Sequence, residues 1–552
     1  EGFKTHTKDS TAYNFDVQNQ VRTNLPNYPR LPVYNYFLRI SKVVDRFGNS
    51  VSFKYSTRTG ANGMVSNNLT SIESSDGRQI SLFYEHATQP NLVTRVTANG
   101  RHWTYQYSDS NMFSLSTVTR PDGRSWTYGL YDDVDASDLF DTYLSDASHG
   151  GCSALASSKI RSKQTLTHPN GIRGDFYFES QLQGTSHTPA LKVYSSSDVT
   201  YAEPRCAVTM SLVKKVLTGP GIDQTWHYRY SENPGAYADQ PALAVAPATI
   251  ESSSVIAERY NLTDLKTTTV TAPDSSITQH VFSRRYDYLA GNEVATRFFD
   301  IATAGRNNTL LRTVMYQFGK SATRAGVSLQ GSGNREAEEY RPDRLLEKTY
   351  DHFANDTDSY SKVYSSFDRY GTAEVVEESN SFSSVVRKTV SSFLHDRNRW
   401  VLHLLTNEQV TQGAESLSLT NFSYYTDPSA DADKLYLKKS KAVFGKLRES
   451  YDYHSQSGKK GLISKIGYPS LTSAMWVSFD GYKRGKAQSI VVPHRYNAGQ
   501  TQQMTLQIND SGSIASVTDF NGNTTSYSYD ALDRVTTIDP PGAFWRSSQI
   551  SY

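Results

Sequence analysis

The sequence predicts an all-β protein in which tandem β-hairpins form one long, curled or spiralling antiparallel sheet. Three observations support this prediction. A unit of turn, strand, turn and strand recurs along the chain, the 552 residues include 37 tyrosines, and the apolar spacing typical of helices is nearly absent. A repeat with a period in the twenties indicates one continuous architecture rather than a series of independent domains.

The repeat unit is clearest in residues 511–543. Asn521-Gly522 favours a type I′ hairpin turn, because both residues tolerate positive φ. Tyr527 and Tyr529 follow two residues apart, so we expect both rings on one face of their strand. Alignment on the turn glycine gives the other copies. The turn glycines are Gly48, Gly77, Gly100, Gly123, Gly171, Gly221 and Gly522.

Large apolar residues follow each turn glycine at plus five and plus seven, and in most copies an aliphatic residue precedes it at minus five. A hairpin with one apolar face buries that face, so these residues are expected to form the core of the repeat. The expected core residues are Tyr55, Tyr84, Tyr105, Tyr107, Tyr128, Phe176, Phe178, Trp226, Tyr228, Tyr527 and Tyr529.

The copies also divide the chain into segments. We expect a lead-in at residues 1–37 with an irregular link at its prolines, hairpins at 38–131, an acidic and small-residue loop at 132–160, and hairpins again at 161–299. Residues 300–510 are β-rich with a blurred register, and a separate propeller or sandwich there is an alternative. Residues 335–346 are the best helix candidate, and residues 511–552 return to the typical repeat.

Size sets a limit on the shape of such a sheet. Periods of about 23 residues over this length would give up to about 48 strands, which at about 4.8 Å per strand make a sheet roughly 230 Å wide. Open twisted sheets rarely exceed about ten strands. The sheet must therefore curl, split or close. We expect a partial hollow shell, a ring or bowl rather than a sealed vessel.

The composition limits the kinds of partner that the chain is expected to bind. The chain carries 57 basic and 55 acidic residues, a net charge of +2, so nothing indicates nucleic-acid binding. No apolar run is long enough for a membrane-spanning helix. The first residues do not form a signal peptide, and Tyr552 falls inside a repeat. We therefore expect the sequence to be a fragment of a longer chain.

Motifs that carry chemistry are scarce. Neither a His-Glu-x-x-His zinc motif nor a Gly-x-Ser-x-Gly elbow occurs, and we expect no catalytic residue and no cofactor. Residues 481–486 imitate a phosphate-binding loop that is one residue short, so we interpret them as a solvated turn. An acidic run offers carboxylates for calcium but lacks the glycine and terminal glutamate of an EF-hand, which favours a solvated loop. Its members are Asp132, Asp133, Asp135, Asp138 and Asp141.

The two cysteines, Cys152 and Cys206, flank the copy at Gly171. Two cysteines are too few for a disulfide scaffold. A single bridge between them and a pair of unpaired thiols both fit the sequence.

The chain resembles the bacterial RHS/YD-repeat family. Residues 529–535, Tyr-Asp-Ala-Leu-Asp-Arg-Val, match that family's Tyr-Asp-x-x-Gly-Arg-Leu, with Asp533 in place of the usual glycine. Residues 38–55, 167–178 and 217–230 also look like blocks of the family. The family's core ends in a self-cleaving Asp-Pro-x-Gly motif. Here Asp539-Pro540-Pro541-Gly542 continues with Ala543 instead of leucine, so we interpret it as an ordinary end of a repeat.

The resemblance implies a function. It indicates a segment of the hollow β-shell of a secreted, polymorphic-toxin-type protein, enclosing a C-terminal cargo domain of the same polypeptide. The alternative is a bacterial cell-surface adhesin that binds glycans or neighbouring cells through Trp103, Trp126 and Trp226. The rings of these tryptophans are also expected to serve as packing residues between strands.

Overall fold

The computed structural model of the chain describes most of its length. The described residues are 2–25, 28–108, 113–130, 161–184, 186–187, 206–231, 250, 253–285, 287–301, 308–321, 341–352, 358–456, 458–469, 475–497, 499–542 and 544–552.

One sheet of 34 strands accounts for nearly all regular structure in these residues. Each strand pairs antiparallel with the next strand in the chain, from β1–β2 through β17–β18 to β33–β34, so the sheet is a continuous meander. The first strand pairs only with β2 and the last only with β33, which leaves the sheet open. The prediction of an all-β, antiparallel hairpin array is confirmed.

The first third of the sheet comes from residues before the 132–160 segment, and the rest follows it. The early strands are β1 (Phe3–His6), β2 (Ala12–Leu25), β3 (Tyr28–Val44), β4 (Ser50–Thr59), β5 (Val65–Ser74), β6 (Gln79–Phe83), β7 (Arg95–Ala98), β8 (Arg101–Tyr107), β9 (Leu115–Thr119) and β10 (Ser125–Gly129). The middle strands are β11 (Arg161–Thr167), β12 (Arg173–Gly184), β13 (Cys206–Gly219), β14 (Ile222–Tyr230), β15 (Leu265–Thr271), β16 (Ile277–Ser283), β17 (Glu293–Phe299), β18 (Leu310–Lys320), β19 (Pro342–Asp351) and β20 (Asp358–Phe367). The late strands are β21 (Ala373–Asn380), β22 (Ser383–Asp396), β23 (Val401–Gln412), β24 (Glu415–Tyr424), β25 (Lys438–Val443), β26 (Lys446–Tyr453), β27 (Ile463–Gly467), β28 (Trp476–Asp480), β29 (Ser489–Pro493), β30 (Thr501–Ile508), β31 (Ile514–Thr518), β32 (Thr524–Tyr529), β33 (Val535–Asp539) and β34 (Ser548–Gln549).

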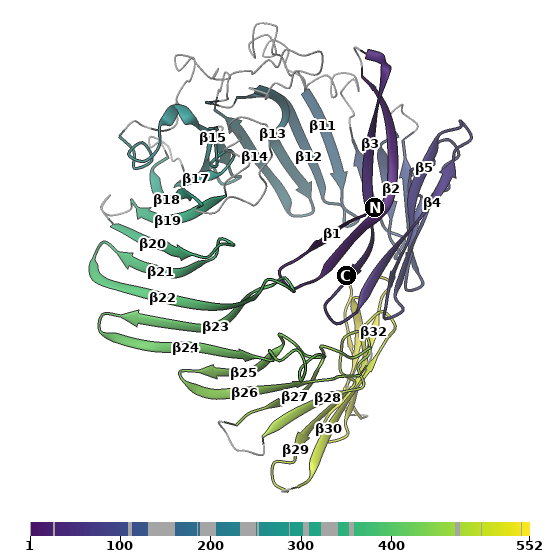
Figure 1. The fold of residues 1–552 in the computed structure, drawn as a ribbon. Coiled ribbons are helices and arrows are strands. Elements are labelled where there is room, and N and C mark those ends of the chain that lie inside the picture. The colour runs from purple at the N-terminus through teal and green to yellow at the C-terminus, as the bar shows by residue number, and fades with distance from the viewer. Residues whose placement is uncertain are drawn as a thin grey trace.

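The sheet curls into a ring. In Figure 1 the strands run from β2–β5 past β11–β15, β20–β24 and β25–β30, and the yellow strands near β32 return to the purple strands at the start of the chain. The two chain ends lie close together in the same view (Figure 1). The sheet is therefore curled. This was expected from the sequence, because so wide a sheet must curl, split or close.

Two expectations about local structure are wrong, and one alternative does not hold for the described residues. Residues 342–346, the end of the helix candidate, belong to strand β19. Pro29 and Pro32 lie inside the long strand β3 instead of an irregular link. The described part of residues 300–510 continues the same meander through β18–β30, so it holds no separate propeller or sandwich. In each case sheet pairing overrides a local preference of the sequence.

The recurrent turn also differs from the prediction. In the 519–523 turn the Gly522 N–H donates to the Asp519 carbonyl at 3.0 Å, and the Asp519 N–H donates to the Asn523 carbonyl at 2.8 Å. Only Gly522 has a positive φ, 84°, so this is a type I turn with a bulge rather than type I′. A type I′ pattern occurs at Asn99-Gly100, where φ is 49° and 73°.

An aspartate side chain fixes this turn, which we name the Asp turn. The Asp519 carboxylate accepts the N–H groups of Asn521 and Asn523, both at 2.8 Å. Asp530 accepts those of Leu532 and Arg534 in the same way, at 2.8 and 3.0 Å. The aspartate of the Tyr-Asp motif is therefore the first residue of the turn, where Asx hydrogen bonding is favoured. The other Asp turns begin at Asp45 and Asp368.

A tyrosine hydroxyl ties the strands together next to many of these turns. The Tyr529 hydroxyl donates to the Ile514 carbonyl at 2.6 Å, and Ile514 belongs to the preceding strand, β31. We name this contact the tyrosine latch. In several copies the ladder to the following strand shifts register just before this tyrosine, as between Ser528 and Tyr529. The other latches in the described residues are Tyr55 to Ile40, Tyr84 to Leu69, Tyr107 to Val93, Tyr230 to Leu212, Tyr424 to Leu405, Tyr482 to Ile463 and Tyr552 to Val535.

Burial is thin along most of the sheet. The expected core residues of the repeat are all half-buried, and the main cluster of fully buried apolar side chains lies under residues 253–264, which include a short 3-10 helix, η3 (Leu262–Asp264). That cluster contains Ile250, Ile256, Leu265, Val281, Val294 and Ala295. A single layer of sheet leaves one face open, so tyrosines with an apolar ring and a hydrogen-bonding tip suit it well.

Replacing Gly522 by alanine tests the turn. A Cβ at Gly522 meets nothing within 4 Å, so the cost comes from the positive φ alone and should be about 1–2 kcal/mol. Native-state hydrogen exchange of the β31 and β32 amides measures this loss. Asn521→Ala, at an exposed neighbour without a positive φ, is the control. Equal protection in the two variants would contradict the turn geometry.

Replacing Tyr529 by phenylalanine tests the latch. The variant keeps the ring and loses the bond to the Ile514 carbonyl, so hairpin stability should fall by about 1 kcal/mol. Tyr527→Phe is the matched control, because no hydroxyl-to-carbonyl latch joins Tyr527 in the part of the chain described. Hydrogen exchange of the same hairpin compares the two variants, and an equal loss in both would argue against the latch.

Alkaline pH should destabilise the sheet. Burial raises the pKa of Tyr55, Tyr84 and Tyr107 above the usual value of 10.0, and it raises the pKa of Tyr453 to about 12. The folded protein thus keeps protons that the unfolded chain releases from about pH 10. Stability should be full below about pH 10 and should fall as pH rises toward about 12. Denaturant titrations across this range check the expectation, and a flat profile would contradict it.

Candidate functional site: the seam between the ends of the sheet

The early hairpins meet the late strands along a line of side-chain contacts, which we name the seam. Arg484 donates to the Asp76 carbonyl at 2.6 Å and lies 3.6 Å from the Asp76 carboxylate. Arg101 pairs with Asp533 at 2.9 Å. Each contact joins a turn of an early hairpin to a turn some 400 residues later. The late turns of the sheet therefore lie beside the early hairpins. At these points side chains make the contact, and the strands of the two parts do not pair.

The N-terminal end of the seam is held by backbone contacts. Asp9 forms an antiparallel bridge with Val401, and the Leu402 N–H donates to the Lys8 carbonyl at 2.7 Å. Close by, the Phe47 ring packs so near Gly461 that a Cβ at Gly461 would lie 2.9 Å from it. A glycine at position 461 is therefore required for the approach of the two parts of the sheet.

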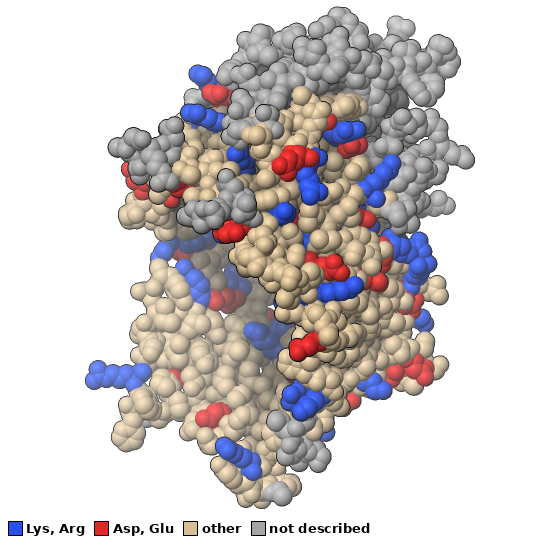
Figure 2. Space-filling model, turned by 90° about the vertical axis from the view of Figure 1, so that its left-hand side faces the viewer, with Lys and Arg blue, Asp and Glu red and all other residues tan. Residues whose placement is uncertain are grey.

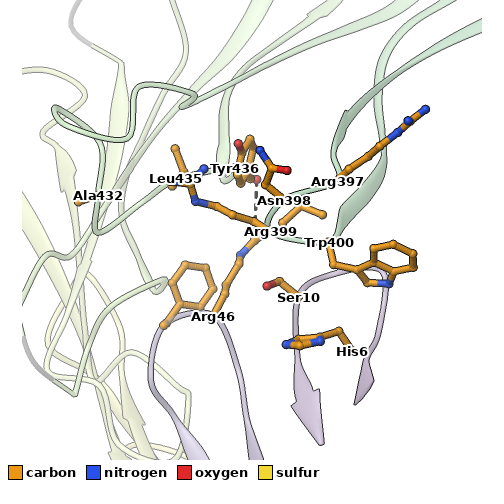
Figure 3. A pocket seen from close by; sticks show the side chains of 12 residues that line it. His6, Ser10, Arg46, Arg397, Asn398, Arg399, Trp400, Ala432, Leu435 and Tyr436 are labelled. Atoms are coloured by element: carbon orange, nitrogen blue, oxygen red, sulfur yellow. Dashed lines mark hydrogen bonds between the residues drawn. The ribbon is translucent and has the colours of Figure 1, made fainter. Parts of the chain in front are cut away.

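A cavity of about 530 Å³ opens at this end of the seam. Figure 3 shows that its side chains come from four places: the start of the chain, the β3–β4 turn, the β22–β23 turn and the segment before β25. Its lining residues are His6, Ser10, Arg46, Phe47, Arg397, Asn398, Arg399, Trp400, Val401, Ala432, Leu435 and Tyr436. Three of these are arginines and none is acidic.

The arginines of the cavity differ in their surroundings. Arg46 is half-buried, and its guanidinium donates to the Tyr436 carbonyl at 3.4 Å. Burial lowers the pKa of Arg46, opposed by the nearby carboxylates of Asp9 and Asp45. Arg399 is exposed and pairs with Asp396 at 3.1 Å. In Figure 3 the guanidinium of Arg397 extends away from the other side chains.

A second cluster joins Asp368, His395 and His403, with the ligand atoms near enough for a metal ion. His403 Nε2 lies 3.0 Å and His395 Nε2 lies 3.6 Å from the Asp368 carboxylate. However, His395 Nδ1 accepts the His403 N–H at 3.1 Å, which places the proton of neutral His395 on Nε2. That protonated nitrogen lies 3.6 Å from the Asp368 carboxylate, too far for a hydrogen bond, and it offers no lone pair to a metal ion. We therefore interpret the cluster as a support of the 368–372 turn, made by the 3.0 Å contact between His403 Nε2 and Asp368.

Asp368 is an ionised carboxylate, which can accept the hydrogen bonds that support this turn. Burial favours the protonated acid, but the N–H groups of Thr372 and Tyr370 and the imidazole of His403 outweigh burial and lower the pKa of Asp368. Burial lowers the pKa of His395, so its imidazole stays neutral at neutral pH.

Some residues proposed for other chemistry lie outside the described residues, and the described ones belong to ordinary turns and strand ends. Asp132, Asp133, Asp135, Asp138, Asp141 and Cys152 lie outside the described residues, as does the Cys206 side chain. Asp539 accepts a hydrogen bond from the Ser547 hydroxyl at 2.5 Å at the end of β33. Residues 481–486 form a tight turn in which Lys483 and Lys486 bond to each other through the backbone.

The tryptophans proposed for glycan contact are engaged within the sheet. Trp126 meets the His168 ring edge to face at 4.3 Å, and Lys215 lies 3.6 Å from the centre of the Trp226 ring. Trp103 is half-buried on β8, opposite Val96. No open aromatic platform results at these three positions.

The turn glycines fall where a positive φ is needed. All seven, from Gly48 to Gly522, have φ between 72° and 92°. The sequence reasoning missed the same turn at residues 368–372 and 509–513 and the seam residues Arg101 and Arg484. Only the Asp-x-x-Gly spacing of 368–371 could have been found in the sequence, because the seam joins positions that no local pattern connects.

Part of the chain is similar to known proteins. Residues 509–543 match the family model described as RHS Repeat. Among curated proteins, none matches the chain. One similar solved structure is a Photorhabdus luminescens Tc holotoxin pore, with 10% identity over 96% of this chain and 26% of that chain and a TM-score of 0.28. Another is a TcdB2-TccC3-TEV structure, with 10% identity over 98% of this chain and 29% of that chain and a TM-score of 0.30.

The chain spans less than a third of the length of these solved structures. At TM-scores this low, the superpositions carry no argument. The assignment rests instead on the matched segment, which contains the Asp turn at Asp519 and the latch at Tyr529. The same turn and latch recur from Asp45 to Tyr55 and elsewhere along the sheet. Residues 509–543 therefore carry an RHS repeat, and other hairpins of the sheet share its turn and its latch.

Proposed function

We propose that this chain is a wall segment of a hollow protein shell, and that the shell encloses a C-terminal cargo domain of the same polypeptide. The observation that carries the proposal is the seam. The last strands contact the first hairpins through side chains, so the meander can form a continuous wall around a space although its two edge strands do not pair. The work of such a wall is exclusion, so it needs no catalytic group.

The wall itself leaves little room for passage. Neighbouring paired strands lie about 4.8 Å apart, so a polypeptide or a protease cannot pass between them. The weak places are the non-paired contacts of the seam. The ion pairs Arg101–Asp533 and Arg484–Asp76 lie at the seam. Their arginine side chains are only 22% and 15% exposed.

The outer surface supports a shielding role. Figure 2 shows basic and acidic side chains mixed over one face, without a large patch of one sign. Such a surface favours solubility and gives no preference for nucleic acid. Among the described residues, no helix has the length and apolar character needed to span a bilayer. We infer that the shell acts after release from the cell that makes it.

The adhesin alternative has less support. Its three candidate tryptophans are packed against neighbouring strands, and their rings are engaged by His168 and Lys215 in two cases. A glycan platform needs an aromatic face that is open to the sugar.

Limited proteolysis of the natural full-length product tests the shell. We expect the cargo domain to resist protease at concentrations that digest the same domain expressed alone. Arg484→Glu together with Arg101→Glu places like charges across the seam, and cargo cleavage should become at least several-fold faster.

Arg448→Glu is the matched control, because Arg448 is exposed on β26 and takes no part in the seam contacts described. Its cleavage rate should equal that of the parent protein. Equal cleavage of enclosed and isolated cargo would overturn the proposal.

A further inference from the structure

We propose that the cavity at the N-terminal end of the seam binds a small molecule through an oxyanion, namely a phosphate group that is either free or attached to a sugar. This binding function is independent of the shell proposal. It follows from the charge, the backbone conformation and the position of the cavity.

The charge of the lining favours an anion. Arg46 is half-buried, and among the described residues no carboxylate lies within ion-pair distance of its guanidinium. Its neighbours are a carbonyl at 3.4 Å and the Phe47 ring at 4.9 Å. The carboxylates of Asp9 and Asp45 act on Arg46 only from beyond ion-pair distance, so a bound oxyanion would be the anion in direct contact with this half-buried cation. A guanidinium can offer two parallel N–H donors to one phosphate.

A second cation and neutral donors stand around the same space. Arg399 comes from the β22–β23 turn, and its pairing with Asp396 holds the side chain at the cavity. Ser10 supplies a hydroxyl, and Asn398 supplies an amide. Trp400 lies at the edge of the cavity and is 42% exposed, and its ring meets the Tyr370 ring edge to face at 6.1 Å.

Backbone strain is concentrated at this place. Ser10, Trp400 and Tyr436 all line the cavity, and all have a positive φ, of 70°, 56° and 61°. Bulky residues rarely adopt this conformation, and such outliers cluster at binding sites and clamps. Three of them around one cavity indicate that the fold fixes the positions of these side chains against their local preference.

The size and position of the cavity also fit a bound ligand. A volume of about 530 Å³ lies in the range of ligand sites, about 300–1,000 Å³. Arg46 belongs to the early hairpins and Arg399 to the late strands. A ligand held by both would bridge the seam, so binding should also raise the thermal stability of the ring.

Isothermal titration calorimetry of the chain tests the proposal with three probes: inorganic phosphate, glucose 6-phosphate and glucose. We expect at least one phosphate compound to bind and glucose alone to fail. Tighter binding of glucose 6-phosphate would identify a sugar phosphate as the ligand, and equal binding would identify free phosphate. The bound compound should also raise Tm.

Two substitutions locate the site. Arg46→Gln should weaken binding at least about tenfold, the loss expected for charge-assisted hydrogen bonds. Arg448→Gln should bind like the parent, because Arg448 is exposed on β26 and does not line the cavity. If Arg46→Gln does not fold, Arg399→Gln serves in its place. Failure of both phosphate compounds to bind the parent, or unchanged binding when the cavity arginine is replaced, would overturn the proposal.

Discussion

The structure depends on one constraint: every strand must pair with its neighbour, and the chain supplies the neighbours strictly in order. A meander of 34 strands has two free edges and one open face. A flat sheet of that width would expose a long edge and gain little burial. Curling brings the early turns against the late ones and converts two distant stretches of surface into the seam. The cavity lies at this seam, and the proposed shell depends on the same closure.

The repeat motif serves this constraint with few residues. The aspartate of Tyr-Asp fixes the turn through backbone N–H groups, and the tyrosine before it holds the preceding strand through its hydroxyl. Both devices act locally and use polar bonds, so they do not need a thick apolar core. This explains why tyrosine is abundant while fully buried apolar residues are few. It also explains how Asp533, with a φ of 62°, can replace the usual glycine: its turn is held by Asp530.

The sequence predicts the architecture well and the local geometry less well. Period, aromatic spacing and turn glycines were sufficient for an all-β hairpin array, because these signals repeat and reinforce each other. The type I′ turn at Asn521-Gly522 was wrong, because the preference of two residues was overridden by Asp519 two positions earlier. Pro29 and Pro32 were misread because this part of β3 pairs only with β2, and the free edge of a strand tolerates proline.

The candidate site could not have been predicted from the sequence. Arg46 and Tyr436, or Arg101 and Asp533, are joined only when the sheet has completed its circuit. The total curvature of the sheet is the sum of small contributions from every hairpin. No local sequence pattern indicates that total, so the residues that meet at the seam cannot be predicted from it. The GYKRGK segment illustrates this: it was interpreted as a solvated turn, yet its Arg484 is largely buried against Asp76.

Closure of the sheet at the seam can be measured by chemical cross-linking. Cysteines in place of Arg101 and Asp533, in a chain whose Cys152 and Cys206 are replaced by serine, should be joined rapidly by a short bifunctional thiol reagent. Cysteines in place of Arg101 and Arg448 should not be joined. Efficient cross-linking of the first pair alone is the result expected for a closed ring. Failure of that pair in the folded protein would mean that the early and late hairpins are not neighbours.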